Sequence, residues 1–569
     1  MRKLLALTSL LLLLLTASFV PVAAAPVDDL TALAEYVPAK SSVYLAVRTD
    51  DGYIEQLDGV IGALNDKLGG ILPEEINVLS FLNATLQDVL DEDIDFEDDV
   101  RPWLGDIGAI VVTVPEPDEL DFGEEDIGGA FVFTVSDGDE ARDFWDDLLE
   151  DAYDIKEAGE GVLYTPANDD MFVPSLYLTD DVLVYRTTAV NPDTLILGED
   201  DDSLADNDEF VDAMNRLPED DYNGVVYAHP SFLMSELNDI QDDLDDAALP
   251  IEDIDLEVIA TAIGPQSAGF TILDDRNFVL DIATNVANRD VLTDAGIMFT
   301  AGDPIDLSFT DLLPENTMLF VQDTGLGSSL ISAFAQLEAL GDYYDELWEA
   351  GDLSFRDRDL TNIDNATIFV RQAIEGLAGL TLQEAFGWMT GDYIVYTSVL
   401  TGISEDIPVL PDVGIIVEDT GDASILSDAV PDVLYQLGLE NEDDDGITVI
   451  PAFGNILQTN DMDILIGANN GVYVTGTRAT IGDVLDGNGG LTTTDAFANA
   501  SNYFLEDAQA LAYVNVPPIA DIATGLAELG VPDMEDVALV LPAFESASIT
   551  ASYDDEGNGV VRLVLSLAD

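Results

Sequence analysis

The chain has 569 residues, with 115 Asp and Glu against 17 Lys and Arg, so its formal net charge at pH 7 is -98. Such a surface repels nucleic acid, because phosphate binding depends on Lys and Arg, and it disfavours anionic lipid headgroups. The absence of cysteine excludes disulfides, thiolate catalysis, iron–sulfur clusters and cysteine-based zinc sites. The hydrophobic content of 47% predicts folded domains rather than the disorder that high net charge alone would suggest.

The N-terminal segment, residues 1–24, predicts a secretory signal peptide. Two basic residues, Arg2 and Lys3, precede an apolar run from Leu4 to Leu15, and small residues follow. A charged start, a run too short to span a bilayer comfortably and a small-residue cleavage pattern are typical of such signals. We predict cleavage after Ala24, with an uncleaved anchor as the alternative. The mature chain contains no apolar run of about 18 residues, so we expect no transmembrane segment in it.

The first half predicts short strands, rich in β-branched and aromatic residues, that alternate with amphipathic helices. In chain order we expect a strand at 43–47, a helix that begins at Asp50 or Asp51, strands at 110–114 and 131–135, a helix over 141–149, and a hairpin of strands 175–178 and 182–185. A Leu204…Phe210 segment, a strand at Tyr227 and a hairpin that turns at 274–277 complete this half.

The second half repeats this pattern. Four landmarks recur in one order, namely Pro38 as Pro314, Gly105 as Gly391, Tyr227 as Tyr513 and Asp274 as Asp554, at offsets of 276, 286, 286 and 280. The repeated elements are strands at 318–321, 393–396 and 414–417, helices over 330–340 and 425–437, the hairpin of 464–467 and 472–474, and a closing turn at 554–559. Pro431 should kink or split the second of these helices.

These elements predict the α+β class. Strands outnumber helices, and hairpin-length turns join many neighbouring strands, so we expect a mainly antiparallel sheet with helices packed on one face. The recurrence predicts two tandem homologous halves, 25–300 and 301–569. Both Gly-Asp pairs, at Gly105 and Gly391, precede strands, and we interpret them as turns, each with a core tryptophan beside it (Trp103 and Trp388).

The Pro-led strand openings, the Trp103-Leu104-Gly105-Asp106 turn and the Leu…Phe…Tyr pattern late in each half resemble a bacterial exported family, domain of unknown function 3352. The resemblance covers about Leu33 to Leu567. The second half departs from the pattern, because Thr390 is inserted before Gly391. The resemblance implies an exported bacterial protein and transfers no activity, catalytic residue or cofactor.

His229 is the only histidine in the chain. A catalytic triad, a zinc site of two histidines or a zinc deaminase signature needs partners that the sequence lacks. We therefore interpret His229 as a hydrogen-bonded residue at the end of a strand. Neither a nucleophile elbow nor a phosphate-binding loop is present. We assign no catalytic residue and no cofactor-binding residue.

A metal site stays open at this stage, because the chain is rich in oxygen ligands. Asp554, Glu556, Asn558 and Gly559 mimic the start of a calcium-binding loop, yet the twelfth position is Leu565, so a hairpin turn is the better interpretation. Four acidic runs have no spacing that fixes a coordination sphere and would gather cations diffusely: Asp91–Asp99, Glu199–Asp202, Asp242–Asp246 and Glu442–Asp445. A salty habitat would also explain the acidity, and we favour it over selective cation binding.

These observations predict an exported, highly acidic, non-catalytic binding or structural protein of the cell envelope or extracellular space, without a cofactor. Its partner would be a protein, polymer or small molecule, and we expect the cleft between the halves to bind it, because pockets concentrate between domains. Two alternatives remain. One is a hydrolase that uses a carboxylate pair, as glycosidases do. The other is a calcium-dependent surface protein.

Overall fold

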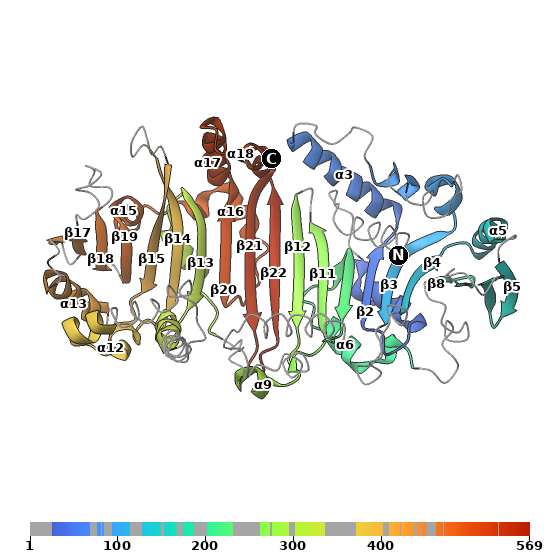
Figure 1. Ribbon diagram of the computed structural model, residues 1–569, viewed down its shortest axis with the longest axis horizontal. Helices are drawn as coiled ribbons and strands as arrows, with labels where there is room; N and C mark the ends of the chain where they lie inside the picture. The colour runs from blue at the N-terminus through green and yellow to red at the C-terminus, as the bar shows by residue number, and fades with distance from the viewer. Residues whose placement is uncertain are drawn as a thin grey trace, which may run out of the picture. The chain divides into compact units, whose positions relative to one another are not determined.

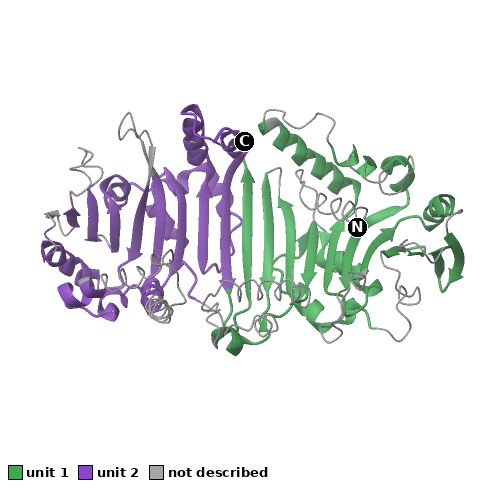
Figure 2. Ribbon diagram, in the orientation of Figure 1, with its two compact units in different colours: residues 1–301, 553–567 green, residues 302–552, 568–569 purple. Residues whose placement is uncertain are grey.

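The computed structural model describes most of the chain after the predicted signal peptide and divides it into two compact units. Unit 1 comprises residues 1–301 and 553–567, and unit 2 comprises residues 302–552 and 568–569 (Figure 2). The described residues are 25–68, 77–80, 82–84, 94–113, 128–149, 153–167, 175–186, 202–230, 262–273, 276–294, 302–335, 371–401, 409–421, 423–436, 438, 441–444, 447–450, 463–469, 471–532 and 534–568.

Unit 1 combines antiparallel strands with short helices (Figure 1). Its elements are β1 (Ala25–Pro26), α2 (Val27–Thr31), η1 (Ala32–Tyr36), β2 (Val43–Arg48), α3 (Asp51–Lys67), η2 (Phe96–Val100), β3 (Leu104–Thr113), β4 (Gly128–Val135), α5 (Gly138–Leu149), β5 (Tyr153–Ala158), β6 (Gly161–Pro166), β7 (Ser175–Leu178), β8 (Val182–Arg186), η5 (Leu204–Asp206), α6 (Asp208–Met214), β9 (Asp221–Tyr222), β10 (Gly224–Ala228), β11 (Gln266–Leu273), β12 (Asn277–Thr284), α9 (Arg289–Asp294) and β22 (Gly559–Leu567).

Unit 2 has the same kind of architecture. Its elements are η7 (Leu307–Leu312), β13 (Thr317–Thr324), η9 (Gln372–Ala378), α12 (Leu382–Phe386), β14 (Asp392–Thr401), β15 (Val409–Glu418), α13 (Ala423–Gln436), β16 (Glu442–Asp444), β17 (Ile447–Ile450), β18 (Ile464–Asn469), β19 (Val472–Thr477), α15 (Arg478–Asp486), η11 (Leu491–Thr493), α16 (Asp495–Ser501), β20 (Ala510–Asn515), α17 (Val516–Glu528), α18 (Met534–Val540), η12 (Leu541–Ala543) and β21 (Phe544–Tyr553).

The strand order of unit 2 matches that of unit 1 from β5 to β11, and unit 1 continues with β12 and β22. Unit 1 runs β5-β6-β7-β8-β4-β3-β2-β10-β11-β12-β22, and unit 2 runs β16-β17-β18-β19-β15-β14-β13-β20-β21. All of these pairings are antiparallel, which confirms the predicted α+β class with a mainly antiparallel sheet.

One face of each sheet, which we call the inner face, carries a core built around three aromatic rings. In unit 1 the ring of Phe210, from α6, lies 5.5 Å from Tyr44 and 5.1 Å from Tyr227. In unit 2 the ring of Phe497, from α16, lies 6.1 Å from Phe320 and 5.1 Å from Tyr513. Successive strand residues point to opposite faces, so each of these strands gives alternate side chains to the core.

The predicted tryptophan anchors are buried in both units. Trp103 packs against Phe144 of α5 at 5.4 Å, and Trp388 packs against Tyr473 of β19 at 5.7 Å. The prediction of a turn at Gly105 was wrong, because Gly105 and Asp106 lie within β3, where the pairing with β4 shifts register between Leu104 and Gly108. Glycine is required there by a close approach, because a Cβ at Gly105 would lie 2.2 Å from the Thr134 hydroxyl.

The C-terminal strand β22 belongs to unit 1, where it pairs with β12. Arg562 of β22 forms an ion pair with Asp281 of β12 at 2.7 Å and with Glu219 at 2.6 Å. The Asp281 side chain is fully buried and also accepts a hydrogen bond from the Tyr222 hydroxyl. We predicted halves that meet at residues 300 and 301. The compact units divide between 301 and 302, and residues 553–567 lie in unit 1.

Two local expectations concern backbone breaks. The predicted helix around Pro431 is a single helix, α13, that runs through the proline and is not split. The Asp554 loop is a turn, in which the Asp554 carboxylate accepts hydrogen bonds from the backbone N–H groups of Glu556 and Asn558 at 2.9 Å. Burial raises the pKa of Asp554, but the hydrogen bonds from Asn558 and Glu556 outweigh it and leave this pKa below its usual value.

Candidate functional site

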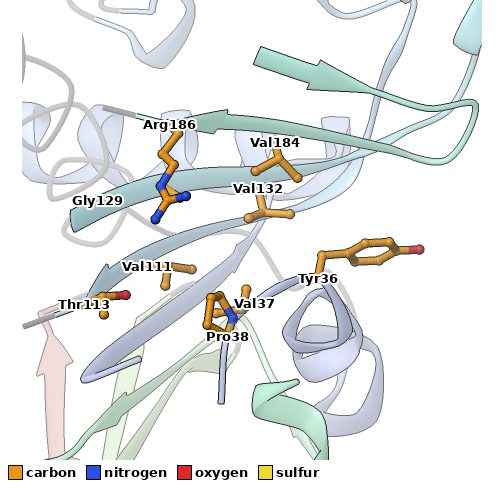
Figure 3. Close-up of a pocket in the computed structure, with 10 residues that line it drawn as sticks. Tyr36, Val37, Pro38, Val111, Thr113, Gly129, Val132, Val184 and Arg186 are labelled. Carbon is orange, nitrogen blue, oxygen red and sulfur yellow. The ribbon is translucent and has the colours of Figure 1, made fainter. Parts of the chain in front are cut away.

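A hollow in unit 1 lies over β3, β4 and β8, beside the Pro38 segment (Figure 3). Its empty volume is about 390 Å³, including space open to solvent. Its walls are mainly aliphatic, and one cation, Arg186, reaches from β8 over β4. Burial lowers the pKa of Arg186 from its usual value. The lining residues are Tyr36, Val37, Pro38, Val111, Thr113, Gly129, Ala130, Val132, Val184 and Arg186.

The same place in unit 2 is filled. Val111, Ala130 and Arg186 form one row across β3, β4 and β8, and the corresponding row in unit 2 consists of Tyr396, Gly414 and Gly476. The Tyr396 ring occupies the space over Gly414, where a Cβ would lie 2.5 Å from it, and its hydroxyl donates to the Thr480 carbonyl at 2.9 Å. Helix α15 thus closes the position from above.

The opposite face of the unit 2 sheet, which we call the aliphatic face, is built from two cross-strand rows. Each row crosses β15, β14, β13, β20 and β21, which spans about 19 Å at the usual strand spacing. The first row is Ile415, Val395, Val321, Ala512 and Ile549, and the second is Val413, Thr397, Leu319, Val514 and Ala547. Neither row contains a charged residue.

The aliphatic face is substantially exposed. Leu319, Val321, Ile549 and Val413 expose 38%, 41%, 45% and 50% of their surface. On the corresponding face of unit 1, Val43 and Leu45, which match Leu319 and Val321, are partly buried, and Phe131 exposes 3%. Scattered exposed aliphatic side chains are ordinary, but a contiguous apolar patch marks a contact surface. The aliphatic face is therefore the candidate binding surface of unit 2.

Carboxylates lie at the ends of the aliphatic face. Asp323 follows Val321 by two residues on β13, so it lies on the same face, and Glu545 precedes Ala547 by two residues on β21. Burial raises the pKa of Asp323, while a hydrogen bond from the Thr324 backbone N–H opposes the rise. The surface therefore has an uncharged middle and acidic ends.

Comparison with known proteins places the chain in a family. The family described as "Protein of unknown function (DUF3352)" has a model that matches residues 3–420. The chain belongs to this family. The resemblance seen in the sequence is thereby confirmed. No curated protein and no solved structure matches the chain.

His229 of this DUF3352 protein lies at the end of β10, as predicted. Its backbone N–H donates to the Ser42 carbonyl at 2.7 Å, and its Nε2 lies 3.7 Å from a Glu209 carboxylate oxygen. Burial lowers the pKa of His229, and the charge of Glu209 partly opposes that shift. The residue at the same place in unit 2 is Asn515.

The acidic runs are only partly described. Asp95–Asp99 form a capped turn in which the Asp95 carboxylate accepts from the N–H groups of Glu97 and Asp98. Asp91–Asp93, Glu199–Asp201 and Asp242–Asp246 lie outside the described residues, as do the side chains of Glu442–Asp445. Within the described ranges, no three Asp, Glu or His side chains come together to hold a metal ion. The same ranges contain no helix of the length and apolar character needed to cross a membrane.

The aliphatic face was missed by sequence reasoning, although a signal was present. Met318–Val321 and Ile394–Val395 are apolar at consecutive positions. Consecutive apolar residues in a strand indicate burial on both faces, whereas a strand with one wet face alternates. The sequence thus contained evidence that both faces of these strands are apolar and suited to contact with other protein surfaces.

Proposed function

We propose that this protein is an exported, non-catalytic binding protein of the cell envelope or extracellular space, and that it binds through the aliphatic face of unit 2. The observation that carries the proposal is the pair of uncharged rows, in which four large side chains are 38–50% exposed, in a chain whose net charge is -98. Burying apolar side chains contributes about 25 cal/mol per Å², so these rows favour any partner that covers them.

The partner that fits this surface is a basic polypeptide segment with an apolar stripe. The five strands that carry the rows are paired within the sheet, so the partner packs side chains on the face rather than adding a strand. Asp323 and Glu545 at the ends favour Lys or Arg. The overall field attracts cations and opposes a second copy of the same chain or an anionic lipid surface.

Titration with a synthetic helical peptide, Leu on one face and Lys on the other, tests the binding surface. We expect Val321→Asp to weaken binding about tenfold or more, because a buried charge costs over 1.4 kcal/mol. Leu529→Asp is the matched control, since it adds the same charge at an exposed position of unit 2, where Leu529 is 67% exposed.

Three outcomes decide the partner. The proposal holds if the Lys peptide binds, added salt weakens it and only the Val321 variant loses it. Unchanged binding in both variants would mean that charge alone attracts the peptide and would overturn the role of the aliphatic face. Binding of neutral phosphatidylcholine vesicles in place of the peptide would overturn the polypeptide partner in favour of lipid.

Export is proposed from the signal at residues 1–24. The mass of the protein recovered from the medium or envelope fraction of a producing cell tests it. A chain that begins at Ala25 is the expected result. An intact Met1 on protein that stays in the cytoplasm would contradict export.

We also infer that the two units arose by tandem duplication. The shared strand order supports this origin. So do the two aromatic triads, in which Phe210 packs against Tyr44 and Tyr227 in unit 1, and Phe497 packs against Phe320 and Tyr513 in unit 2. A third shared detail supports it as well. Leu204 N–H donates to the Val37 carbonyl at 2.7 Å, and Leu491 N–H donates to the Leu313 carbonyl at 3.1 Å.

A further inference from the structure

Three hydroxyl groups in the core of unit 2 have no hydrogen-bond partner. They belong to Tyr513 of β20 and to Ser546 and Ser548 of β21. Tyr513 and Ser546 expose 0% of their surface, and Ser548 exposes 3%. These groups lie on the inner face and are distinct from the aliphatic face.

The three hydroxyls are neighbours. Tyr513 pairs directly with Ser548 across the two strands, and Ser546 lies two residues from Ser548, so all three side chains share one face. The surroundings of the Tyr513 hydroxyl shift its pKa. Burial raises its pKa, the charge of Glu545 raises it further, and a hydrogen-bond-type contact with the Ser546 hydroxyl lowers it, although the geometry of that contact falls short of a well-formed hydrogen bond.

An orphaned hydroxyl is costly in a protein core. Leaving one buried polar group without a partner costs about 1–3 kcal/mol, and more than about 90% of such groups in native proteins are satisfied by protein or by ordered water. Three orphans side by side would therefore be a large fraction of the stability of a domain, which is typically about 5–15 kcal/mol. A shared partner resolves all three at once.

We propose that an internal water site lies between Tyr513, Ser546 and Ser548. Each hydroxyl both donates and accepts, as water does, and a buried water typically makes about three hydrogen bonds. A bound ion is disfavoured, because the three groups carry no charge and the rings of Phe320 and Phe497 pack against Tyr513. Glu545 lies on the opposite face of β21 by alternation.

In unit 1 the corresponding serine hydroxyl forms a direct hydrogen bond with the protein and needs no water. Ser267 occupies the place of Ser548, since it pairs with Tyr227 as Ser548 pairs with Tyr513. Its hydroxyl donates directly to the Ala213 carbonyl at 2.6 Å. The place of Ser546 is taken by Pro265, which has no hydroxyl. The water site is thus specific to unit 2.

The sign of a stability change tests the proposal. If water bridges the hydroxyls, Tyr513→Phe and Ser548→Ala each break its hydrogen bonds, and we expect the melting temperature to fall by about 2–4 °C. If the hydroxyls are dry orphans, removing one leaves the melting temperature unchanged or raises it, because an unsatisfied group disappears. That second result would overturn the proposal.

Two further measurements keep the test decisive. Ser267→Ala is the control, because loss of its direct hydrogen bond should lower the melting temperature whichever result unit 2 gives. A crystal structure of the unmodified chain at high resolution should then show a water within hydrogen-bond distance of all three hydroxyls. A dry site there would overturn the proposal even if the variants fail to fold.

Discussion

The two units share one strand order and differ in what fills the same position. In unit 1 the row of Val111, Ala130 and Arg186 borders a hollow, whereas in unit 2 a large ring, Tyr396, lies over Gly414. Because Gly414 has no Cβ, the Tyr396 ring can lie against its backbone. The comparison shows that one scaffold accepts different packing as long as volume lost on one strand is supplied by its neighbour.

The units differ again on their other faces. The unit 1 residues that match Leu319 and Val321 are Val43 and Leu45, which are partly buried, whereas Leu319 and Val321 expose 38% and 41% of their surface. Both pairs are aliphatic, so composition does not distinguish them. The greater exposure in unit 2 is what supports the proposal that the aliphatic face binds a partner.

The largest expected effect concerns the strand that completes unit 1. Arg562→Met leaves Asp281 buried without its cation, which should destabilise the protein by about 3–5 kcal/mol. Urea unfolding followed by proteolysis should show that unit 1 is lost first. The matched control in unit 2 is Arg371→Met, whose partner Glu375 lies 3.7 Å away, with the two side chains 39% and 48% exposed.

An exposed ion pair of that kind contributes about 0–1 kcal/mol. Equal losses in the two variants would mean that the pairing of β22 with β12 does not depend on the Arg562–Asp281 contact.

A smaller effect tests whether the side-chain volumes of Tyr396 and Gly414 compensate for each other. Gly414→Ala alone should destabilise unit 2 by about 1–3 kcal/mol, because the new Cβ strikes the Tyr396 ring. Adding Tyr396→Val recreates the unit 1 pair, so the double variant should be less unstable than the sum of the single changes. Melting curves of the four chains measure this coupling. If the destabilisation of the double variant equals the sum of the two single variants, the side-chain volumes of the two residues do not compensate for each other.

A pH-dependent effect should distinguish the aspartates of the two Gly-Asp pairs, Asp106 and Asp392. Burial raises the pKa of Asp392 above 3.8, the hydrogen bonds from the Asp306 N–H and Gln322 oppose this, and the charges of Glu418 and Asp306 add to the rise. The folded state therefore takes up this proton first as pH falls, so charged Asp392 costs stability at neutral pH.

The difference in unfolding free energy between wild type and Asp392→Asn should shift in favour of wild type as pH falls from 7 through the raised pKa to about 3.8. Asp106→Asn is the control in unit 1, since that side chain is 78% exposed. A difference that stays constant with pH would contradict the role of burial at Asp392.

The smallest effect is a direct titration of the only imidazole. Because burial lowers the pKa of His229 below 6.5, its single NMR resonance should titrate below that value. Glu209→Gln should lower the midpoint further, since the glutamate charge opposes the shift. The unfolded chain takes up the proton first, so this contribution to stability is lost as pH falls below about 6.5. A midpoint at or above 6.5 would contradict it.

Much of the fold was predictable from local patterns. The runs at Val43 and Phe131, the hairpin of β7 and β8 and the Trp103 anchor follow from alternation, turn residues and aromatic content, which act over a few residues. The hollow and the aliphatic face were not predicted. They depend on which strands become neighbours, and neighbours such as β4 and β8 lie 50 residues apart in the chain.

By itself the sequence determined the element types, the repeated order of landmarks, the absence of cysteine chemistry and the strongly acidic character, because each depends on composition or on neighbours in the chain. Only the tertiary structure decided that β22 completes unit 1, that Arg562 meets Asp281, and that four large apolar side chains on one face of unit 2 are 38–50% exposed. These outcomes come from contacts between distant segments, whose energies depend on burial and register that no local pattern records.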